Sequence, residues 1–152
     1  MIFHKVEPRR NQKTLWNRMA CSMGLLMAFS QMLSCNSDDF VLVENGKSDY
    51  SIVVAARADS LSLQAAHELQ KYIGQISGVT LPIITNEDKP SGHEIVLGNS
   101  ERLSEYGLQE KIAALDEDGF IIQTRGKKLI IAGGKDKGTL YGVYTFLEDY
   151  LG

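Results

Sequence analysis

The stretch DEDGFIIQTRGKKLIIAGG, residues 116–134, contains two short apolar runs on either side of a polar turn. The runs lie at residues 120–122 (FII) and 129–131 (LII), and both are rich in the β-branched residues that favour strands. The turn between them, at residues 125–127 (RGK), contains a glycine and no apolar residue, which suits a tight connection. The stretch therefore predicts a β-hairpin and makes a sheet the centre of the fold.

A glycine-rich turn and a helix follow the hairpin. Residues 133–152 read GGKDKGTLYGVYTFLEDYLG, and their apolar spacing predicts a helix from about Asp136 to Tyr150. The turn has the outline of a phosphate-binding loop, which requires a lysine directly after its last glycine. Here Thr139 follows Gly138 directly. We therefore expect a tight strand-to-helix turn, in which glycines allow positive φ and a close approach of the backbone.

The rest of the body predicts more strands and one more long helix. Apolar residues recur at helical spacing up to about Ser77, with Asp59 or Ser60 as the residue that caps the first turn. Residues 100–115 predict one short helix, or two that are broken at Gly107. The remaining strands are predicted at residues 40–46, 50–56, 81–85 and 93–98, and the first two form a hairpin. Hairpins mixed with helices predict an α+β fold, a mixed sheet with two main helices packed on it.

The charges divide the chain into a basic leader and an acidic body. Residues 1–34 carry five Lys or Arg and one Glu, a net charge of +4. The rest of the chain carries 11 Lys or Arg and 18 Asp or Glu, a net charge of −7. Nucleic-acid binding needs clustered Lys and Arg in the folded part, because contacts with phosphates supply much of the attraction. The acidic body therefore argues against nucleic acid as a partner.

The leader has the pattern of an export signal. A polar, basic segment ends at Arg18, and the mostly apolar residues 19–34 follow, too few for a comfortable membrane-spanning helix of about 20 apolar residues. The sequence MLSC, which ends at Cys35, resembles the bacterial lipobox. The sequence CNSDDF resembles the acidic export tag of surface lipoproteins in Bacteroidetes-type bacteria. An ordinary cleaved signal with an incidental Cys35 is the alternative.

These patterns predict three parts of the chain. Residues 1–34 are a lipoprotein signal peptide, residues 35–39 a lipidated cysteine with an acidic tether, and residues 40–152 a folded domain. Cys35 is the expected lipidation site, and its lipid would hold the domain on the membrane, at the outer membrane or cell surface. Cys21 lies in the signal, which leaves Cys35 without a partner for an internal disulfide. The domain must therefore be held together by its apolar core.

The sequence contains no credible catalytic or metal-binding set. Residues 67–71 (HELQK) begin like the zinc-binding His-Glu-x-x-His helix, but Lys71 replaces the second histidine. Residues 116–118 (DED) are adjacent acids, whereas glycosidase carboxylates must flank a bond from separate supports. The Gly-x-Ser-x-Gly motif of serine hydrolases does not occur. We therefore expect no catalytic residue, no metal and no cofactor.

Four segments of the body carry a resemblance to a known family. They are AAHELQKYIGQISGVTLPI (65–83), IVLG (95–98), DGFIIQTRGKKLIIAGG (118–134) and GTLYGVYTFLEDYLG (138–152). Together they resemble the N-terminal domain of alpha-glucuronidases, which is similar to the domain before the barrel in family 20 beta-hexosaminidases. The resemblance implies a zincin-like fold without the metal centre. It also implies a non-catalytic domain followed by a (β/α)8 barrel that holds the catalytic carboxylates, none of which can be carried over to this sequence.

The terminal helix carries more apolar surface than a single contact requires. Its apolar residues form one stripe at helical spacing, and others widen the stripe beyond the ~100° of an ordinary surface helix. The stripe is Leu140, Tyr144, Leu147 and Leu151, and the residues that widen it are Val143, Phe146 and Tyr150. One side is expected to pack on the domain's own sheet and the other to meet a downstream barrel. Tyr141, Tyr150 and Leu151 are the expected domain-junction residues, and we expect the sequence to stop before the barrel.

Two functions are compatible with these expectations. The first is a non-catalytic accessory domain of a cell-surface glycoside hydrolase that degrades polysaccharides, with the downstream barrel as its partner. The second is a stand-alone surface lipoprotein that binds a glycan or a protein partner. Glycan-binding faces expose aromatic rings for stacking on sugars, whereas the tyrosines here mostly fall in core or junction patterns. The sequence therefore favours the first function.

Overall fold

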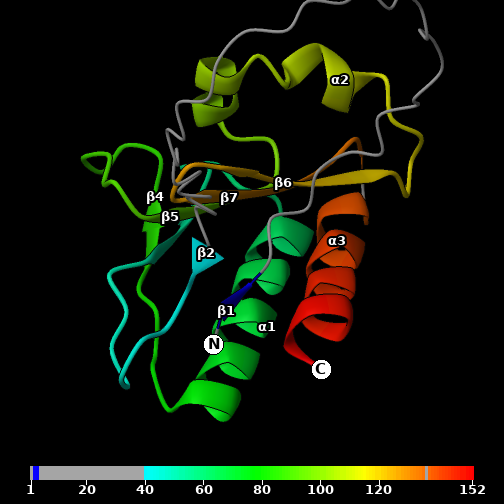
Figure 1. Ribbon diagram of the computed structural model, residues 1–152. Helices are drawn as coiled ribbons and strands as arrows, with labels where there is room; N and C mark the ends of the chain where they lie inside the picture. Colours follow the sequence, from blue (N-terminus) through cyan, green and yellow to red (C-terminus); the bar gives the residue numbers. More distant parts are fainter. Residues whose placement is uncertain (1, 4–39, 136) are drawn as a thin grey trace, which may run out of the picture.

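The structure is a computed structural model that describes residues 2–3, 40–135 and 137–152 (Figure 1). Apart from β1 (Ile2–Phe3), the expected signal peptide lies outside the described residues, and so do Cys35 and the acidic tether. Strand β1 pairs antiparallel with β2 (Phe40–Val41) in a small two-stranded sheet.

A five-stranded sheet forms the centre of the domain. Its strands are β3 (Ser51–Val54), β4 (Ile83–Thr85), β5 (Glu94–Leu97), β6 (Phe120–Arg125) and β7 (Lys128–Gly133). The spatial order is β4-β3-β5-β7-β6, and all neighbours are parallel except β6 and β7. The antiparallel pair is the predicted hairpin, in which Arg125 lies opposite Lys128 and Gly126 has a φ of 56°. A glycine with positive φ at the first turn position suits a two-residue hairpin turn.

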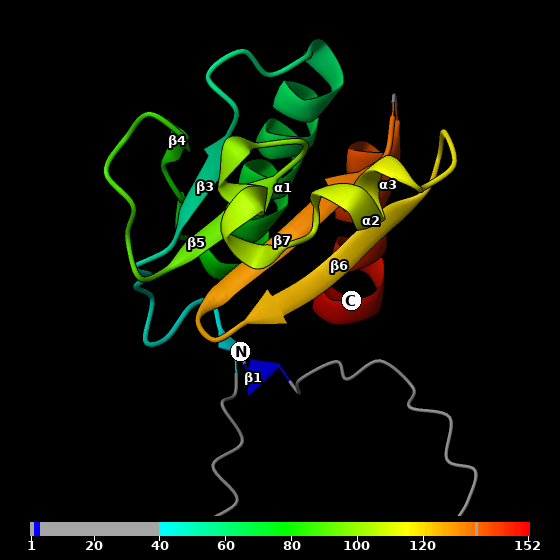
Figure 2. The same ribbon diagram turned by 90° about the horizontal axis from the view of Figure 1, so that it is seen from above.

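Helices cover both faces of this sheet (Figures 1 and 2). On one face lie α1 (Ser60–Ser77) and α3 (Gly138–Phe146), and α3 continues into a π-helical turn, η2 (Leu147–Leu151). On the other face lie a 3-10 helix, η1 (Glu101–Tyr106), and the short α2 (Gln109–Ala113). The expected α+β fold, a mixed sheet with two main helices packed on it, is confirmed at this level.

The central strands supply apolar side chains to two separate clusters. The larger cluster packs strand residues against α1, α3 and η2: Ile52, Val54, Ile95, Leu97, Leu129 and Ile131. The smaller cluster packs the alternate residues Val96, Ile130 and Ala132 against Leu103, Leu108 and Ile112 of the η1–α2 segment. Apolar residues therefore point to both faces along β5 and β7, as is usual for parallel strands with helices on both sides.

Local signals set the ends of the helices. The side chain of Asp59 caps α1, since its Oδ1 accepts a hydrogen bond of 2.8 Å from the Ser62 N–H, and Gly78 ends the helix with a φ of 73°. Between η1 and α2, Gly107 adopts a φ of 62°. Of the two alternatives for residues 100–115, two helices broken at Gly107 is the one observed.

The predicted hairpin of residues 40–46 with residues 50–56 is wrong. Strand β2 pairs with β1, whereas β3 lies between β4 and β5 and is parallel to both. Of the predicted hairpin, only the turn at Asn45 and Gly46 is observed, and Glu44 and Lys47 form an isolated antiparallel bridge around it. The physical reason is burial, because residues 52–54 are all less than 9% exposed and therefore belong in the middle of a covered sheet.

The glycine-rich turn from β7 into α3 is tight, as predicted, but only one of the two expected causes applies. A Cβ atom on Gly133 would lie 2.3 Å from the Thr139 backbone nitrogen, and one on Gly138 would lie 2.4 Å from the Gly119 carbonyl oxygen. Neither Gly133 nor Gly138 is among the glycines with positive φ. These glycines therefore serve the close approach of backbones and not a left-handed conformation.

Two glycines inside helices allow a matched test of packing. A Cβ on Gly142 of α3 would lie 2.8 Å from Cγ2 of Ile131, whereas the nearest atom to a Cβ on Gly74 of α1 would be the Val79 carbonyl oxygen at 3.8 Å. We expect Gly142→Ala to lower the free energy of unfolding by about 1–3 kcal/mol through overpacking. Gly74→Ala should raise it by about 0.5–1 kcal/mol, because alanine restricts the unfolded chain.

Urea unfolding of the full chain and of both variants measures these changes. Opposite signs for the two substitutions would confirm that α3 is pressed onto β6 and β7. Stabilisation by Gly142→Ala would contradict the close packing of α3 on the sheet.

Candidate functional site

The expected junction residues lie in three different environments. Tyr141 is 38% exposed on the outer side of α3. Tyr150 is half-buried, and its ring stacks on Phe146 with the centroids 5.6 Å apart. Leu151 is buried in the larger core cluster. Of the three residues, Tyr141 is therefore the one with most of its ring free to meet another surface.

The inner stripe of the terminal helix differs from the predicted one at a single position. Leu140, Leu147 and Leu151 are buried, as expected, but Tyr144 is 36% exposed. Gly142 decides this orientation, because it lies against Ile131 of the sheet and so turns the neighbouring tyrosines outward. The buried stripe of α3 and η2 therefore lacks Tyr144, which lies on the exposed side of the helix.

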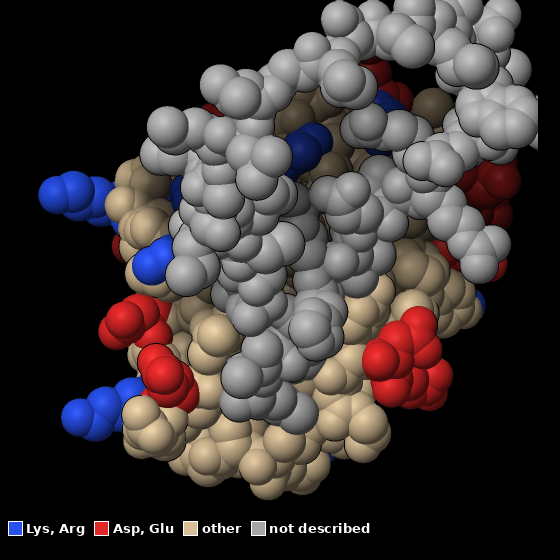
Figure 3. Space-filling view, in the orientation of Figure 1, with Lys and Arg blue, Asp and Glu red and all other residues tan. Residues whose placement is uncertain are grey.

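Five large apolar residues on α1 and α3 are exposed, and we call them the outer helix surface. They are Leu63, Tyr72, Ile76, Tyr141 and Tyr144. The side chain of Lys71 partly covers this surface, with Nζ 4.8 Å from the centre of the Tyr72 ring. In the space-filling view of Figure 3, uncharged side chains fill the lowest part of this face, and charged side chains lie to its left and right.

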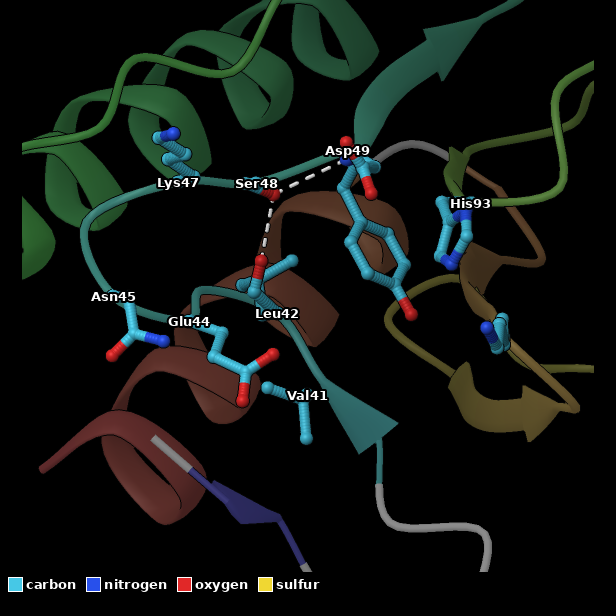
Figure 4. A pocket seen from close by; sticks show the side chains of 10 residues that line it. Val41, Leu42, Glu44, Asn45, Lys47, Ser48, Asp49 and His93 are labelled. Carbon is cyan, nitrogen blue, oxygen red and sulfur yellow. Dashed lines mark hydrogen bonds between the residues drawn. The ribbon is translucent and has the colours of Figure 1, made fainter.

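A hollow of about 670 Å³ lies where β3, β5 and β7 begin (Figure 4). The loop at residues 41–50 forms one side of it, and His93 and Lys127 from the ends of β5 and the β6–β7 turn form the other. The hydroxyl of Ser48 shapes the loop by donating to the Leu42 carbonyl oxygen at 2.6 Å and accepting from the Tyr50 N–H at 3.1 Å. The lining of the hollow is mixed in charge and contains two carboxylates, two ammonium groups and an imidazole.

The aromatic residue of the hollow belongs to the core. Tyr50 is 4% exposed, and its ring makes edge contacts with Phe40 at 5.0 Å and His93 at 5.1 Å between centroids. Burial raises the pKa of the Tyr50 hydroxyl to about 12, so it stays protonated and cannot act as a base near neutral pH. Since the face of Tyr50 is covered, the hollow presents no aromatic platform for stacking on a sugar.

A buried ion cluster joins η1 to strands β5 and β7. The side chain of Glu94 is 0% exposed and forms an ion pair with Arg102 of η1 through its Oε1 atom. The Nζ atom of Lys128 lies 3.1 Å from Oε2 of Glu94, and the Ser91 N–H donates to Oε1 at 2.8 Å. Arg102 also donates to the carbonyl oxygen of Asp88 at 2.6 Å. The cluster therefore fastens η1 to β5, β7 and the loop before β5.

The charges of this cluster stabilise one another. Burial opposes the ionisation of Glu94, but the hydrogen bonds from Ser91, Arg102 and Lys128 outweigh it and hold the pKa of Glu94 below its usual 4.5. Burial likewise disfavours the charged form of Lys128, yet Tyr106 and Glu94 raise the pKa of Lys128 above its usual value. This cluster was not predicted from the sequence, because Glu94 precedes an apolar strand and carries no motif.

The other residues considered for catalysis do not converge. The acids at residues 116–118 are all exposed, and His67 and Lys71 are exposed on α1. Within residues 40–135 and 137–152, no group of three or more His, Cys, Asp or Glu side chains could hold a metal ion. Among the described helices, none has the length and apolarity to cross a membrane.

Comparisons with known proteins agree with the family resemblance. Residues 36–146 match the family model described as Glycosyl hydrolase family 67 N-terminus. Alpha-glucuronidase A of Emericella nidulans is 33% identical over 87 residues, which are 55% of this chain and 10% of that protein. The chain therefore spans about a tenth of the length of this relative.

Two solved structures also match part of the chain. One, described as the structure of CpGH84D, matches 62% of this chain and 16% of its own with a TM-score of 0.43 and 14% identity. The other is BtGH115A, described as a GH115 4-O-methyl-alpha-glucuronidase with specificity for decorated arabinogalactans. It matches 67% of this chain and 14% of its own with a TM-score of 0.45 and 16% identity. Because the family match covers most of the chain, the protein belongs to the glycosyl hydrolase family 67 N-terminus family.

Proposed function

We propose that this chain is the non-catalytic accessory domain of a cell-surface glycoside hydrolase that degrades polysaccharides. The family match over residues 36–146 carries the proposal, because it includes almost the entire folded body. The domain's role is structural: it supports and orients a catalytic (β/α)8 barrel.

The architecture suits a rigid support. Helices cover both faces of the sheet, and the buried ion cluster ties η1 to β5 and β7. The outer helix surface is the part of the domain that we assign to the contact with the barrel, and Tyr141 and Tyr144 are its residues on α3. In this proposal the fold is a zincin-like domain of the beta-hexosaminidase type without a metal centre, in which Lys71 occupies the position of the second zinc ligand.

Location at the cell surface is part of the same proposal. Cys35 would carry a lipid, and residues 36–39 would connect it to β2, the first strand of the body. Replacing Cys35 with Ser should move the protein from the membrane fraction to the soluble or unprocessed fraction. Membrane-bound Cys35→Ser protein of mature size, or wild-type protein without a lipid, would remove the anchor from the proposal.

An activity assay tests the non-catalytic role. We expect the full chain to release no product from aryl glucuronides or other aryl glycosides, and to bind no stoichiometric zinc by elemental analysis. A turnover that is lost when one acid at residues 116–118 is changed to its amide would contradict the proposal. The corresponding substitution at exposed Glu101 is the control for contaminating activity.

The stand-alone glycan-binding lipoprotein is the alternative function. The hollow beside β3 and β5 is the observation that favours it, because its mixed polar lining could hydrogen-bond to sugar hydroxyls. The buried ring of Tyr50 weighs against it, since no aromatic face is available there. Shifts of the His93 and Lys127 NMR signals on addition of oligosaccharides would favour this alternative over the accessory domain.

A further inference from the structure

The two edges of the five-stranded sheet are protected very differently. Strand β4 forms one edge, and Figure 2 shows β6 at the opposite edge. Sheet edges carry free N–H and C=O groups that can pair with another strand, and proteins usually shorten, charge or cover them. The two edges can therefore be compared directly for such protection.

Strand β4 is protected in two ways. It contains only three residues. The side chain of Asp88 occupies the Thr85 N–H, with a distance of 2.8 Å to Oδ2. The edge at β4 is therefore largely closed to an added strand.

Strand β6 has none of these protections. It runs for six residues, FIIQTR, in continuous register with β7 and without a bulge, Pro or Lys. Its first five residues are all half-buried, and it carries apolar side chains toward both clusters, Ile122 toward the larger one and Ile121 toward the smaller. Among the described residues, no strand pairs with its outer edge.

The backbone groups that point outward follow from the hairpin. Arg125 and Lys128 flank a two-residue turn and form a hydrogen-bonded pair, so the groups of Arg125 point toward β7. Direction alternates along a strand, which leaves the N–H and C=O groups of Phe120, Ile122 and Thr124 on the free edge. Three outward-pointing residues are enough for a ladder with a second strand.

We propose that this edge pairs antiparallel with β6 of a second copy of the chain. The charges at its two ends are the reason for this partner. Three acids at residues 116–118 precede β6, whereas Arg125 and Lys127 follow its apolar part. Antiparallel pairing of two copies places the acidic end of each beside the basic end of the other, whereas parallel pairing would place like charges together.

The proposed pairing gives a closed dimer with two-fold symmetry. A two-fold axis perpendicular to the sheet and near Ile122 places Phe120 opposite Thr124 of the other copy, so that like faces continue across the interface. Each copy uses the open β6 edge of its five-stranded sheet, because the β4 edge is protected, and the assembly stops at a dimer with a continuous ten-stranded sheet. This surface is separate from the outer helix surface, so the inference does not depend on the proposed contact with a barrel.

Sedimentation velocity of the full chain tests the proposal. The parent protein for this experiment carries Cys21→Ser and Cys35→Ser, which exclude disulfides and lipid. Mild detergent keeps the apolar residues 19–34 in solution. One charge variant carries Arg125→Glu and Lys127→Glu, and the other carries Asp116→Lys and Asp118→Lys. Either variant alone should dimerise at least about tenfold more weakly than the parent, because like charges meet at both ends. A mixture of the two should form a heterodimer, since opposite charges then meet again.

Two further variants complete the design. Thr124→Pro removes an outward-pointing N–H without removing a bond to β7, and it should abolish the dimer while leaving the fold intact by circular dichroism. The control variant carries Lys71→Glu and Lys89→Glu, at exposed positions on α1 and on the loop after β4. It changes the net charge by the same amount as Arg125→Glu with Lys127→Glu and should leave the dimer unchanged. A parent chain that stays monomeric at high concentration, or a mixture of charge variants that fails to dimerise, would overturn the proposal.

Discussion

Replacement of Arg102 with methionine is expected to lower the free energy of unfolding by about 3–5 kcal/mol, because it leaves the buried carboxylate of Glu94 with one cation fewer. Arg102 is 4% exposed, so little water can take its place. The substitution also removes the donor to the Asp88 carbonyl oxygen, which frees the loop before β5. Urea unfolding at pH 7 measures the loss.

An exposed ion pair is the matched control. Lys71 and Glu68 lie 3.4 Å apart on α1, and the side chain of Lys71 is 52% exposed. Pairs of this kind contribute only about 0.2–0.5 kcal/mol, so Lys71→Met should have a small effect. If Arg102→Met costs no more than Lys71→Met, the buried cluster does not hold η1 to the sheet.

The effect of Arg102→Met should depend on pH. The folded-state pKa of Glu94 is lowered below 4.5, so its ionised form contributes stability above about pH 4.5, and this contribution is lost as the pH falls through the folded pKa. Without Arg102 the pKa of Glu94 rises, so the ionised Glu94 contributes less stability to the variant, and the variant loses less stability in acid than the parent does. The difference in stability between parent and variant should therefore be greatest near neutral pH and shrink in acid. A difference that stays constant from pH 7 to pH 3 would contradict the electrostatic origin of the effect.

The second large effect is expected at two adjacent residues of α3. Val143 is 0% exposed in the larger core cluster, whereas Tyr144 is 36% exposed on the outer helix surface. Val143→Lys buries an unpaired charge and should cost at least about 3 kcal/mol, which leaves a marginally stable domain largely unfolded. Tyr144→Lys should change the free energy of unfolding by no more than about 0.5 kcal/mol.

Circular dichroism and thermal unfolding separate the two outcomes. Tyr144→Lys should also improve the solubility of the isolated chain, because it interrupts the exposed apolar residues of the outer helix surface. Equal intolerance at Val143 and Tyr144 would mean that the whole circumference of α3 is internal core. The outer helix surface could not then be the contact with a barrel.

Local patterns in the sequence were sufficient for the elements whose interactions are local. The β6–β7 hairpin needs only two strand-forming runs and a short turn, and α1 needs only apolar spacing with a cap at Asp59. Gly107 marks a helix break because its φ of 62° is unfavourable for other residues. These features could be predicted without knowledge of distant contacts.

The errors in the predicted strand pairing concern strands whose partners are distant in the sequence. Residues 51–54 pair with residues 83–85 and 94–96, and no local signal distinguishes those partners from the nearby residues 40–46. The continuous apolar run IVV at residues 52–54, without alternation, was the available indication of a covered parallel strand.

The candidate sites were also predicted poorly where they depend on contacts between residues that are distant in the sequence. Tyr144 was assigned to the wrong side of its helix, because the apolar arc is wide and the contact of Gly142 with Ile131 is not visible in the sequence. The Glu94–Arg102–Lys128 cluster was missed, since it joins three elements that carry no shared motif. Cys35 remains a prediction from the leader alone and is outside the described residues.

If this domain supports a catalytic barrel in the same polypeptide, the size of the protein in its own cells should reveal the barrel. An antibody raised against the folded body, residues 40–152, should detect a membrane-associated protein several times larger than the 152-residue chain, because the barrel would be part of the same polypeptide. A single band no larger than the 152-residue chain, with no glycoside hydrolase retained on the same antibody, would show that the domain supports no barrel.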